Sequence, residues 1–158
     1  YARRHGFEQF STEIPKRREE YEAKLKSLGT GTVGCVVLDK NGYLAAATST
    51  GGKGFELVGR VSDSATVAGN YANDFCGVSL TGVGEDIVSG AMAAKIVTRV
   101  TDGMSLEKAV EKTFDEIKPF DGFAGAICID KFGNIVHRDS FPTMVFASFD
   151  GISLEVFL

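Results

Sequence analysis

The chain has 158 residues, of which 44% are hydrophobic and 24% charged, a composition typical of a globular domain rather than of a disordered segment. Its formal net charge of −4 argues against nucleic acid as the main partner, because phosphate binding requires a basic face. No apolar stretch approaches the roughly 20 residues that cross a bilayer, so the sequence predicts no membrane partner.

Residues 1–31 differ from the rest of the chain and are interpreted as a helical linker. The chain does not begin with methionine, so we expect a fragment or a processed piece. Ser11 to Glu13 followed by Pro15 is typical of a helix start, and Gly29 of a helix end. The apolar residues at helical spacing are Ile14, Tyr21, Leu25 and Leu28. The main portion then runs over residues 32–158.

A β-hairpin is predicted next, with a hydroxyl residue at each of its two open ends. Residues 33–38 are apolar and rich in β-branched side chains, Asp39 to Gly42 has turn composition, and a second strand follows over 43–48. Thr32 and Thr50 stand equally far from the turn. We therefore expect these two side chains to lie at the same edge of the hairpin.

Beyond the hairpin, helices are flanked by further strands. Residues 51–69 are rich in Gly, Ser and Asp and predict a loop of functional length. One helix is opened by Glu85 and broken at Asp102-Gly103. A second helix is capped by Ser105 and ended by Pro119. The remaining strands are predicted at 76–80, 124–129, 135–137, 144–148 and 152–157. This order indicates an α+β fold, in which two helices cover one face of a sheet and another sheet or chain must cover the other.

Thr32 is the candidate nucleophile. A threonine at a chain end carries its own base, because the α-amino group has an unperturbed pKa of roughly 7.7–8.0. Here Thr32 follows Gly31, so this chemistry requires cleavage of the bond between them, where glycine tolerates strained backbone angles. From the residues alone, a threonine that merely begins a strand remains the simpler interpretation.

Arg60 and Asp63 form a second candidate feature. Opposite charges three residues apart in a loop bordered by glycine suit a zwitterion, with guanidinium on a carboxylate and carboxylate on an ammonium. The alternative is that they pair with each other at the surface. The stretch Thr81 to Gly84, between a strand and a helix, either presents backbone N–H groups to an oxyanion or is a structural turn.

Five short motifs occur in order over about residues 30–130. They are Gly31-Thr32-Val33-Gly34, Thr48-Ser49-Thr50-Gly51-Gly52, Gly59-Arg60-Val61-Ser62-Asp63-Ser64, Tyr71-Ala72-Asn73 and Thr81-Gly82-Val83-Gly84-Glu85. Together they resemble the plant-type asparaginase / isoaspartyl aminopeptidase family of N-terminal-nucleophile hydrolases. The resemblance implies a four-layer αββα sandwich, made as a precursor that cuts itself, of which this chain carries the linker and the β-subunit portion without the α half.

The resemblance also implies the chemistry. Cleavage at Gly31-Thr32 would free Thr32 as the nucleophile, and Thr50 would hydrogen-bond it. The substrate-binding residues implied are Arg60 for the α-carboxylate, Asp63 for the α-ammonium, Thr81 and Gly82 for the oxyanion, and Gly84 for the pocket wall. The reaction implied is hydrolysis of the side-chain amide of L-asparagine or of β-aspartyl peptides.

Two alternatives remain open. One is a glycosylasparaginase-like hydrolase. The other is a non-catalytic relative that keeps the amino-acid clamp, and its best argument is Ser62, which stands where the family usually has glycine. The chain departs from the family further at Ala65, in a shorter loop over 66–71, and at 140–144. These departures affect substrate preference more than the chemistry.

The resemblance gives the partners as a small substrate and the protein's own α-subunit, in an (αβ)2 heterotetramer. No cofactor and no metal are expected within this chain, because His5 and His137 are too few and too far apart. The family's structural sodium loop lies in the α piece. The cysteines, Cys35, Cys76 and Cys128, form no Cys-x-x-Cys pair and sit in apolar runs. They predict reduced, buried thiols and a cytoplasmic location.

Overall fold

The computed structural model of the chain describes residues 6, 15, 19, 31–52, 56–120, 122–140 and 144–157. The linker helix predicted up to Gly29 therefore lies outside the described residues, apart from Pro15 and Glu19. The division of the chain at residue 31 stays a prediction.

The described strands form three antiparallel sheets. The first is a hairpin of β1 (Thr32–Leu38) and β2 (Leu44–Thr50). The second has the order β3-β4-β5-β6, from β3 (Asn70–Ala72), β4 (Cys76–Gly82), β5 (Ala124–Asp130) and β6 (Ile135–Asp139). The third is a hairpin of β7 (Phe146–Phe149) and β8 (Leu154–Phe157).

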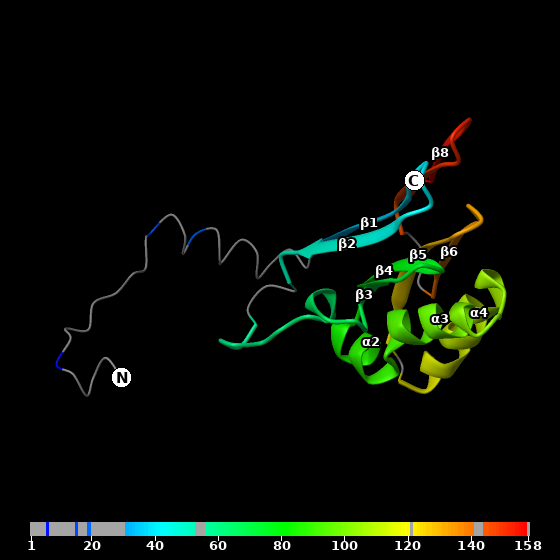
Figure 1. The fold of residues 1–158 in the computed structure, drawn as a ribbon. Coiled ribbons are helices and arrows are strands. Elements are labelled where there is room, and N and C mark those ends of the chain that lie inside the picture. Colours follow the sequence, from blue (N-terminus) through cyan, green and yellow to red (C-terminus); the bar gives the residue numbers. More distant parts are fainter. Residues whose placement is uncertain are drawn as a thin grey trace.

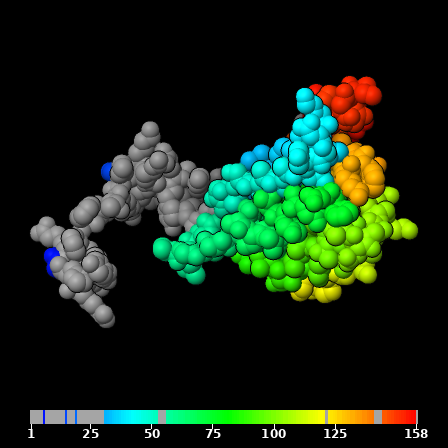
Figure 2. Space-filling model, in the orientation of Figure 1, coloured from blue at the N-terminus to red at the C-terminus, as the bar shows by residue number. Residues whose placement is uncertain are grey.

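The helices are α2 (Gly84–Gly90), α3 (Met92–Thr101) and α4 (Leu106–Ile117), with short 3-10 turns at Asp63–Ala65 and Lys118–Phe120. They pack on one face of the four-stranded sheet, and the β1–β2 hairpin lies on the other (Figure 1). Figure 2 shows the β7–β8 hairpin, in red, projecting beyond this packed body. The predicted α+β class is confirmed.

The hydrophobic core lies between the helices and the four-stranded sheet. Val78 and Leu80 of β4 pair with Cys128 and Ala126 of β5, and all are buried. The helix residues buried against them include Ile87, Met92, Ile96, Val97, Val110 and Phe114. Burial of each large apolar side chain stabilises the fold by about 1.5–3 kcal/mol.

The opposite face of the sheet is built for close approach of the hairpin. A Cβ at Gly34 would lie 2.2 Å from Ser79 Oγ, and one at Gly77 would lie 3.3 Å from the Ala45 carbonyl oxygen. Thr48 Oγ1 and Ser79 Oγ share a hydrogen bond of 2.6 Å across this contact. Because glycine has no side chain, these two positions allow β1 and β2 to pack directly on β4.

The structure corrects several predicted elements. The single helix expected from Glu85 to Asp102 is broken at Ala91, which has φ +48°. Gly90, beside the break, packs closely on α4, where a Cβ would lie 2.9 Å from Ile117 Cγ2. Strand β3 was not predicted, and Ser105 stands at the helix start without a side-chain capping bond.

Candidate active site

The open end of the β1–β2 hairpin brings the two predicted threonines together. Their Cα atoms are partners in the strand register, and Thr32 Oγ1 donates a hydrogen bond of 3.2 Å to Thr50 Oγ1. The Gly52 backbone N–H donates to the same Thr50 oxygen at 3.0 Å. The Thr50 oxygen therefore accepts two hydrogen bonds, one from the Thr32 hydroxyl and one from the Gly52 backbone.

The junction before Thr32 is open. A Cβ at Gly31 would meet no atom within 4 Å, and Gly31 is not among the glycines with positive φ. The backbone strain for which glycine was expected at this bond is therefore not seen in the structure.

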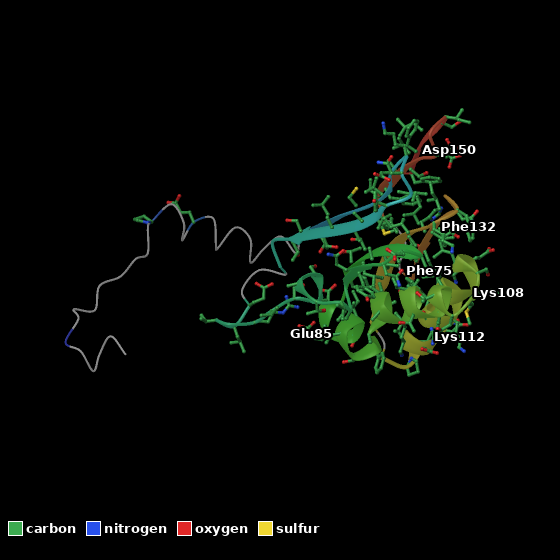
Figure 3. All side chains as sticks on the ribbon, viewed as in Figure 1. Phe75, Glu85, Lys108, Lys112, Phe132 and Asp150 are labelled. Atoms are coloured by element: carbon green, nitrogen blue, oxygen red, sulfur yellow. The ribbon has the colours of Figure 1, made fainter. Side chains whose placement is uncertain are left out.

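Arg60 is partly buried, with 20% of its side chain exposed, and it faces two acidic residues. Its Nη2 donates to Glu85 Oε1 at 2.9 Å, and its Nη1 lies 3.8 Å from Glu56 Oε1. Figure 3 shows Glu85 on α2, far from Phe132 and Asp150 at the other end of the molecule. Among the described residues these are the ion pairs of Arg60, so it does not pair with Asp63.

Asp63 is a buried carboxylate, only 5% exposed. Its Oδ1 accepts a hydrogen bond of 2.8 Å from Ser62 Oγ, whereas its Oδ2 has no hydrogen-bond partner in the described part of the chain. A buried polar atom without a partner costs about 1–3 kcal/mol, and more when charged. The burial of this unpartnered oxygen is therefore unfavourable for folding by itself.

Two glycines at the junction of β4 and α2 allow close approach, and Gly84 leaves room around these charges. A Cβ at Gly84 would lie 2.7 Å from Asp63 Oδ1 and 3.1 Å from Arg60 Nη2. Gly82 has φ +140°, and a Cβ there would lie 2.2 Å from the Phe123 carbonyl oxygen. That carbonyl accepts the Val83 N–H at 2.9 Å, so this N–H is not available to an oxyanion.

A small cavity of about 90 Å³ gathers the predicted residues. It is lined by Thr32, Thr50, Gly52, Arg60, Ser62, Asp63, Thr81, Gly82, Gly84 and Phe123. All the residues to which the sequence assigned a catalytic or substrate-binding role are among them. A polar cleft of about 500 Å³ adjoins the cavity and shares Thr50, Gly52, Arg60 and Ser62 with it.

The sequence did not predict Gly52, Ser62 and Phe123 as lining residues. Gly52 has φ +75°, and its place two residues after Thr50 was the sequence signal that could have indicated its position in the cavity wall. Ser62 was visible only as a departure from the family pattern. Phe123 reaches the cavity because it precedes β5, whose Ala124 pairs with Gly82. No sequence pattern indicates that long-range pairing.

Other features of the described residues offer no second site of this kind. A hollow of about 830 Å³ lies around Phe75, Lys131 and Phe132, but it contains none of the predicted residues. No three His, Cys, Asp or Glu side chains of the described ranges cluster as a metal site would require. No helix in the described part of the chain is long and apolar enough to cross a membrane.

The arrangement suits an amino-acid substrate. It places a cation and a carboxylate beside a pair of hydroxyl groups in one small, polar cavity. The cation matches a carboxylate, and the carboxylate matches an ammonium group. A hydroxyl beside a bound substrate is a potential nucleophile once a base is available.

Comparisons with known proteins agree with this chemistry. Residues 2–157 match the family model described as Asparaginase. The chain is similar to an isoaspartyl peptidase/L-asparaginase of Synechocystis sp., with 50% identity over 124 residues, which are 78% of this chain and 38% of that protein. It is also similar to the isoaspartyl peptidase of Escherichia coli, with 48% identity over 110 residues, 66% of this chain and 34% of that protein.

The human isoaspartyl peptidase/L-asparaginase is 36% identical over 151 residues, which cover 89% of this chain and 49% of that protein. The chain therefore spans between about a third and a half of the length of these curated relatives.

Proposed function

The chain belongs to the isoaspartyl peptidase/L-asparaginase family, and on that premise we propose that it is the nucleophile-bearing portion of an amidohydrolase. The observation that carries the proposal is the small cavity into which the structure gathers Thr32, Thr50, Arg60 and Asp63. The substrates proposed are L-asparagine and β-aspartyl peptides, in which a side-chain amide lies beside a free α-amino-acid head.

The proposed reaction begins with self-cleavage at Gly31-Thr32. While that bond is intact, the Thr32 nitrogen is an amide and cannot act as a base, so we propose that the uncleaved chain is inactive. Cleavage gives Thr32 an α-amino group, which takes the proton from Oγ1 as the oxygen attacks the amide carbon. Thr50 orients the attacking oxygen, as the 3.2 Å contact between the two hydroxyl groups supports.

The tetrahedral intermediate carries a negative oxygen, which we assign to Thr81 and Gly82 as the stabilising residues. Its collapse breaks the carbon–nitrogen bond, and the leaving amine takes the proton from the Thr32 ammonium. An ester on Thr32 remains. Water then attacks this ester with the same amine as base, which releases aspartate and restores Thr32. Arg60 and Asp63 hold the substrate head group throughout, and Gly84 leaves room for it.

The proposal extends to the assembly. We propose that residues 1–31 are the linker, that the protein's own α-subunit completes an αββα sandwich, and that two processed protomers form an (αβ)2 heterotetramer. The apolar outer face of the β1–β2 hairpin, where Val33 is 69% exposed, supports a further layer over it. The three cysteines are all unpaired, but only Cys76 and Cys128 are buried, so the expectation of a buried thiol is wrong for the exposed Cys35. A cytoplasmic location is proposed from the unpaired state of the three thiols. No cofactor is proposed for this chain, and a structural sodium is assigned to the α piece.

Mass spectrometry of the purified full-length protein tests the mechanism. We expect a mature fragment that begins at Thr32, and we expect Thr32→Ala to remain uncleaved and inactive. A mature fragment with a different first residue, or full turnover by Thr32→Ala, would rule out the proposed nucleophile. Incubation with asparagine, a β-aspartyl dipeptide and a glycosylated asparagine distinguishes the proposed activity from that of a glycosylasparaginase, which would hydrolyse the glycosylated substrate.

Ser62, which replaces the usual glycine and donates a hydrogen bond to Asp63, still supports the alternative of a non-catalytic relative. Calorimetry with L-aspartate, combined with the same turnover assays, distinguishes the two. Binding of aspartate without turnover of any of the three substrates would establish the non-catalytic relative.

A further inference from the structure

Ser62 occupies a specific place in the cavity. It lines the cavity together with Asp63, and its Oγ donates a hydrogen bond of 2.8 Å to Asp63 Oδ1. It also precedes the short turn Asp63–Ala65, where it makes two long and weak contacts with Ser64: it accepts from the backbone N–H at 3.4 Å and lies 3.5 Å from the hydroxyl oxygen. The hydroxyl therefore has one strong partner, and that partner is the carboxylate.

The direction of this bond determines what Ser62 can offer a ligand. A hydroxyl has one hydrogen and two acceptor lone pairs, and an ionised carboxylate only accepts. Because the hydrogen is committed to Asp63, the Ser62 oxygen is left as an acceptor. Two acceptor oxygens thus stand 2.8 Å apart on the cavity wall. An ammonium group carries three N–H donors and no acceptor, so it can donate to both oxygens at once.

The two carboxylate oxygens of Asp63 face different surroundings. Oδ2 lies over Gly69, where a Cβ would stand only 2.5 Å away, and it is buried without a partner among the described residues. Oδ1 lies beside Gly84, which lines the cavity. The oxygen that a ligand in the cavity can reach is therefore Oδ1, the same oxygen to which Ser62 donates.

We propose that Ser62 Oγ is a second acceptor for the substrate's α-ammonium group, beside Asp63 Oδ1, and that it sets the selectivity for substrates that carry this group. The inference rests on the proposed function, because it assigns Asp63 to the ammonium. Its competitor is a purely structural Ser62 that only caps the turn at Asp63–Ala65. A cap is indifferent to the ligand's ammonium, whereas the proposed acceptor is not.

The test uses two ligands that differ only by the ammonium, L-aspartate and succinate. Their affinities are measured by calorimetry on the processed full-length protein and on its Ser62→Ala variant. We expect Ser62→Ala to weaken aspartate about tenfold and to change succinate less than about twofold. Ser62→Thr keeps the hydroxyl and is expected to restore aspartate binding.

Ser89→Ala is the matched control, since Ser89 is an exposed serine of α2 outside the cavity. It should bind both ligands as the parent protein does. Equal losses for aspartate and succinate, or no loss for either, would overturn the proposal. Because the readout is binding, a protein that binds aspartate with the expected Ser62 dependence but hydrolyses nothing would refute the proposed function alone.

Discussion

At the scale of single residues, the proposed chemistry depends on the contact between Thr50 and Thr32. The Thr50 oxygen accepts from both Thr32 and the Gly52 backbone, so its position is fixed by the chain as well as by the hydroxyl pair. A catalytic oxygen must lie within a fraction of an ångström of its productive position, and a displacement of about 1 Å costs roughly 100-fold in rate.

We therefore predict that Thr50→Val lowers kcat roughly 100-fold in the processed protein, with a smaller change in KM. Valine has the shape of threonine but offers no oxygen to Thr32. Steady-state kinetics with asparagine measure the effect. Thr50→Ser should retain most activity, and Thr98→Val, at an exposed threonine of α3, should retain all of it. A Thr50→Val variant with parental kcat would remove Thr50 from the mechanism.

At the scale of elements, the helix layer supports the sheet that carries Thr81 and Gly82. Ile96 of α3 is fully buried in the core, whereas Val88 of α2 is 46% exposed. Truncating a buried isoleucine leaves a cavity in the core, which adds to the loss of apolar burial.

We predict that Ile96→Ala lowers the free energy of unfolding by about 2–5 kcal/mol, and that Val88→Ala changes it by less than about 1 kcal/mol. Urea denaturation of the full-length protein measures both. Similar losses for the two variants would contradict the assignment of the core to this face of the sheet.

The turn of the β1–β2 hairpin depends on one carboxylate. Asp39 Oδ1 accepts the backbone N–H groups of Asn41 and Tyr43, each at 2.8 Å. These bonds, with that of Tyr43 the largest contribution, lower the pKa of Asp39 below its ordinary value of 3.8. A lowered pKa means that the ionised form stabilises the fold above the unfolded-state pKa, and that this contribution is lost as the pH falls through the folded-state pKa.

The corresponding prediction compares the parent protein with Asp39→Asn, which keeps an acceptor oxygen but does not titrate. The difference between their melting temperatures should be largest near neutral pH and should shrink below about pH 4. Thermal unfolding in a pH series measures it. A difference that stays constant from neutral pH to pH 3 would show that the charge of Asp39 contributes nothing.

At the scale of the whole molecule, the uncovered face of the β1–β2 hairpin is the dominant feature. Val33 and Val37 point away from the four-stranded sheet, and Val37 is 48% exposed. The β7–β8 hairpin also exposes apolar side chains, which are Phe149, Leu154 and Val156. Such surfaces are rare on a complete monomer, which supports a further layer supplied by the rest of the protein.

This surface predicts opposite effects of Val37→Lys in two contexts. In the isolated chain the variant should increase the soluble yield, because a charge replaces an exposed apolar group. In the full-length protein it should lower the melting temperature, because the charge would be buried under the added layer. Expression trials and thermal unfolding of both forms measure this. A full-length variant as stable as its parent would contradict an interface on this face.

The meeting of two threonines could be predicted from the residues themselves, whereas the rest of the cavity was predicted from the family resemblance. Thr32 and Thr50 meet because a hairpin with a short turn fixes its own register, and Arg60 and Asp63 are close along the chain. Phe123 and the Ser79 contact with Thr48 could not be predicted, because they depend on pairing between distant strands. The break at Ala91 was missed because helical periodicity continues across it, and only the left-handed backbone of Ala91 in the structure reveals it.

In the seven-residue pairing of β1 with β2, successive side chains point to opposite faces, so the strand register decides which face Thr32 occupies. One residue added or removed inside β1 would turn Thr32 to the other face relative to the turn, and the same change inside β2 would turn Thr50 away, so the two hydroxyl groups would no longer meet. A residue added between Asp39 and Tyr43 lies about 20 Å from Thr32, but it also changes the turn that fixes the register of the two strands. Loop grafts, affinity tags or fluorescent labels placed at that tip must therefore preserve the strand register, which the Thr32–Thr50 contact requires.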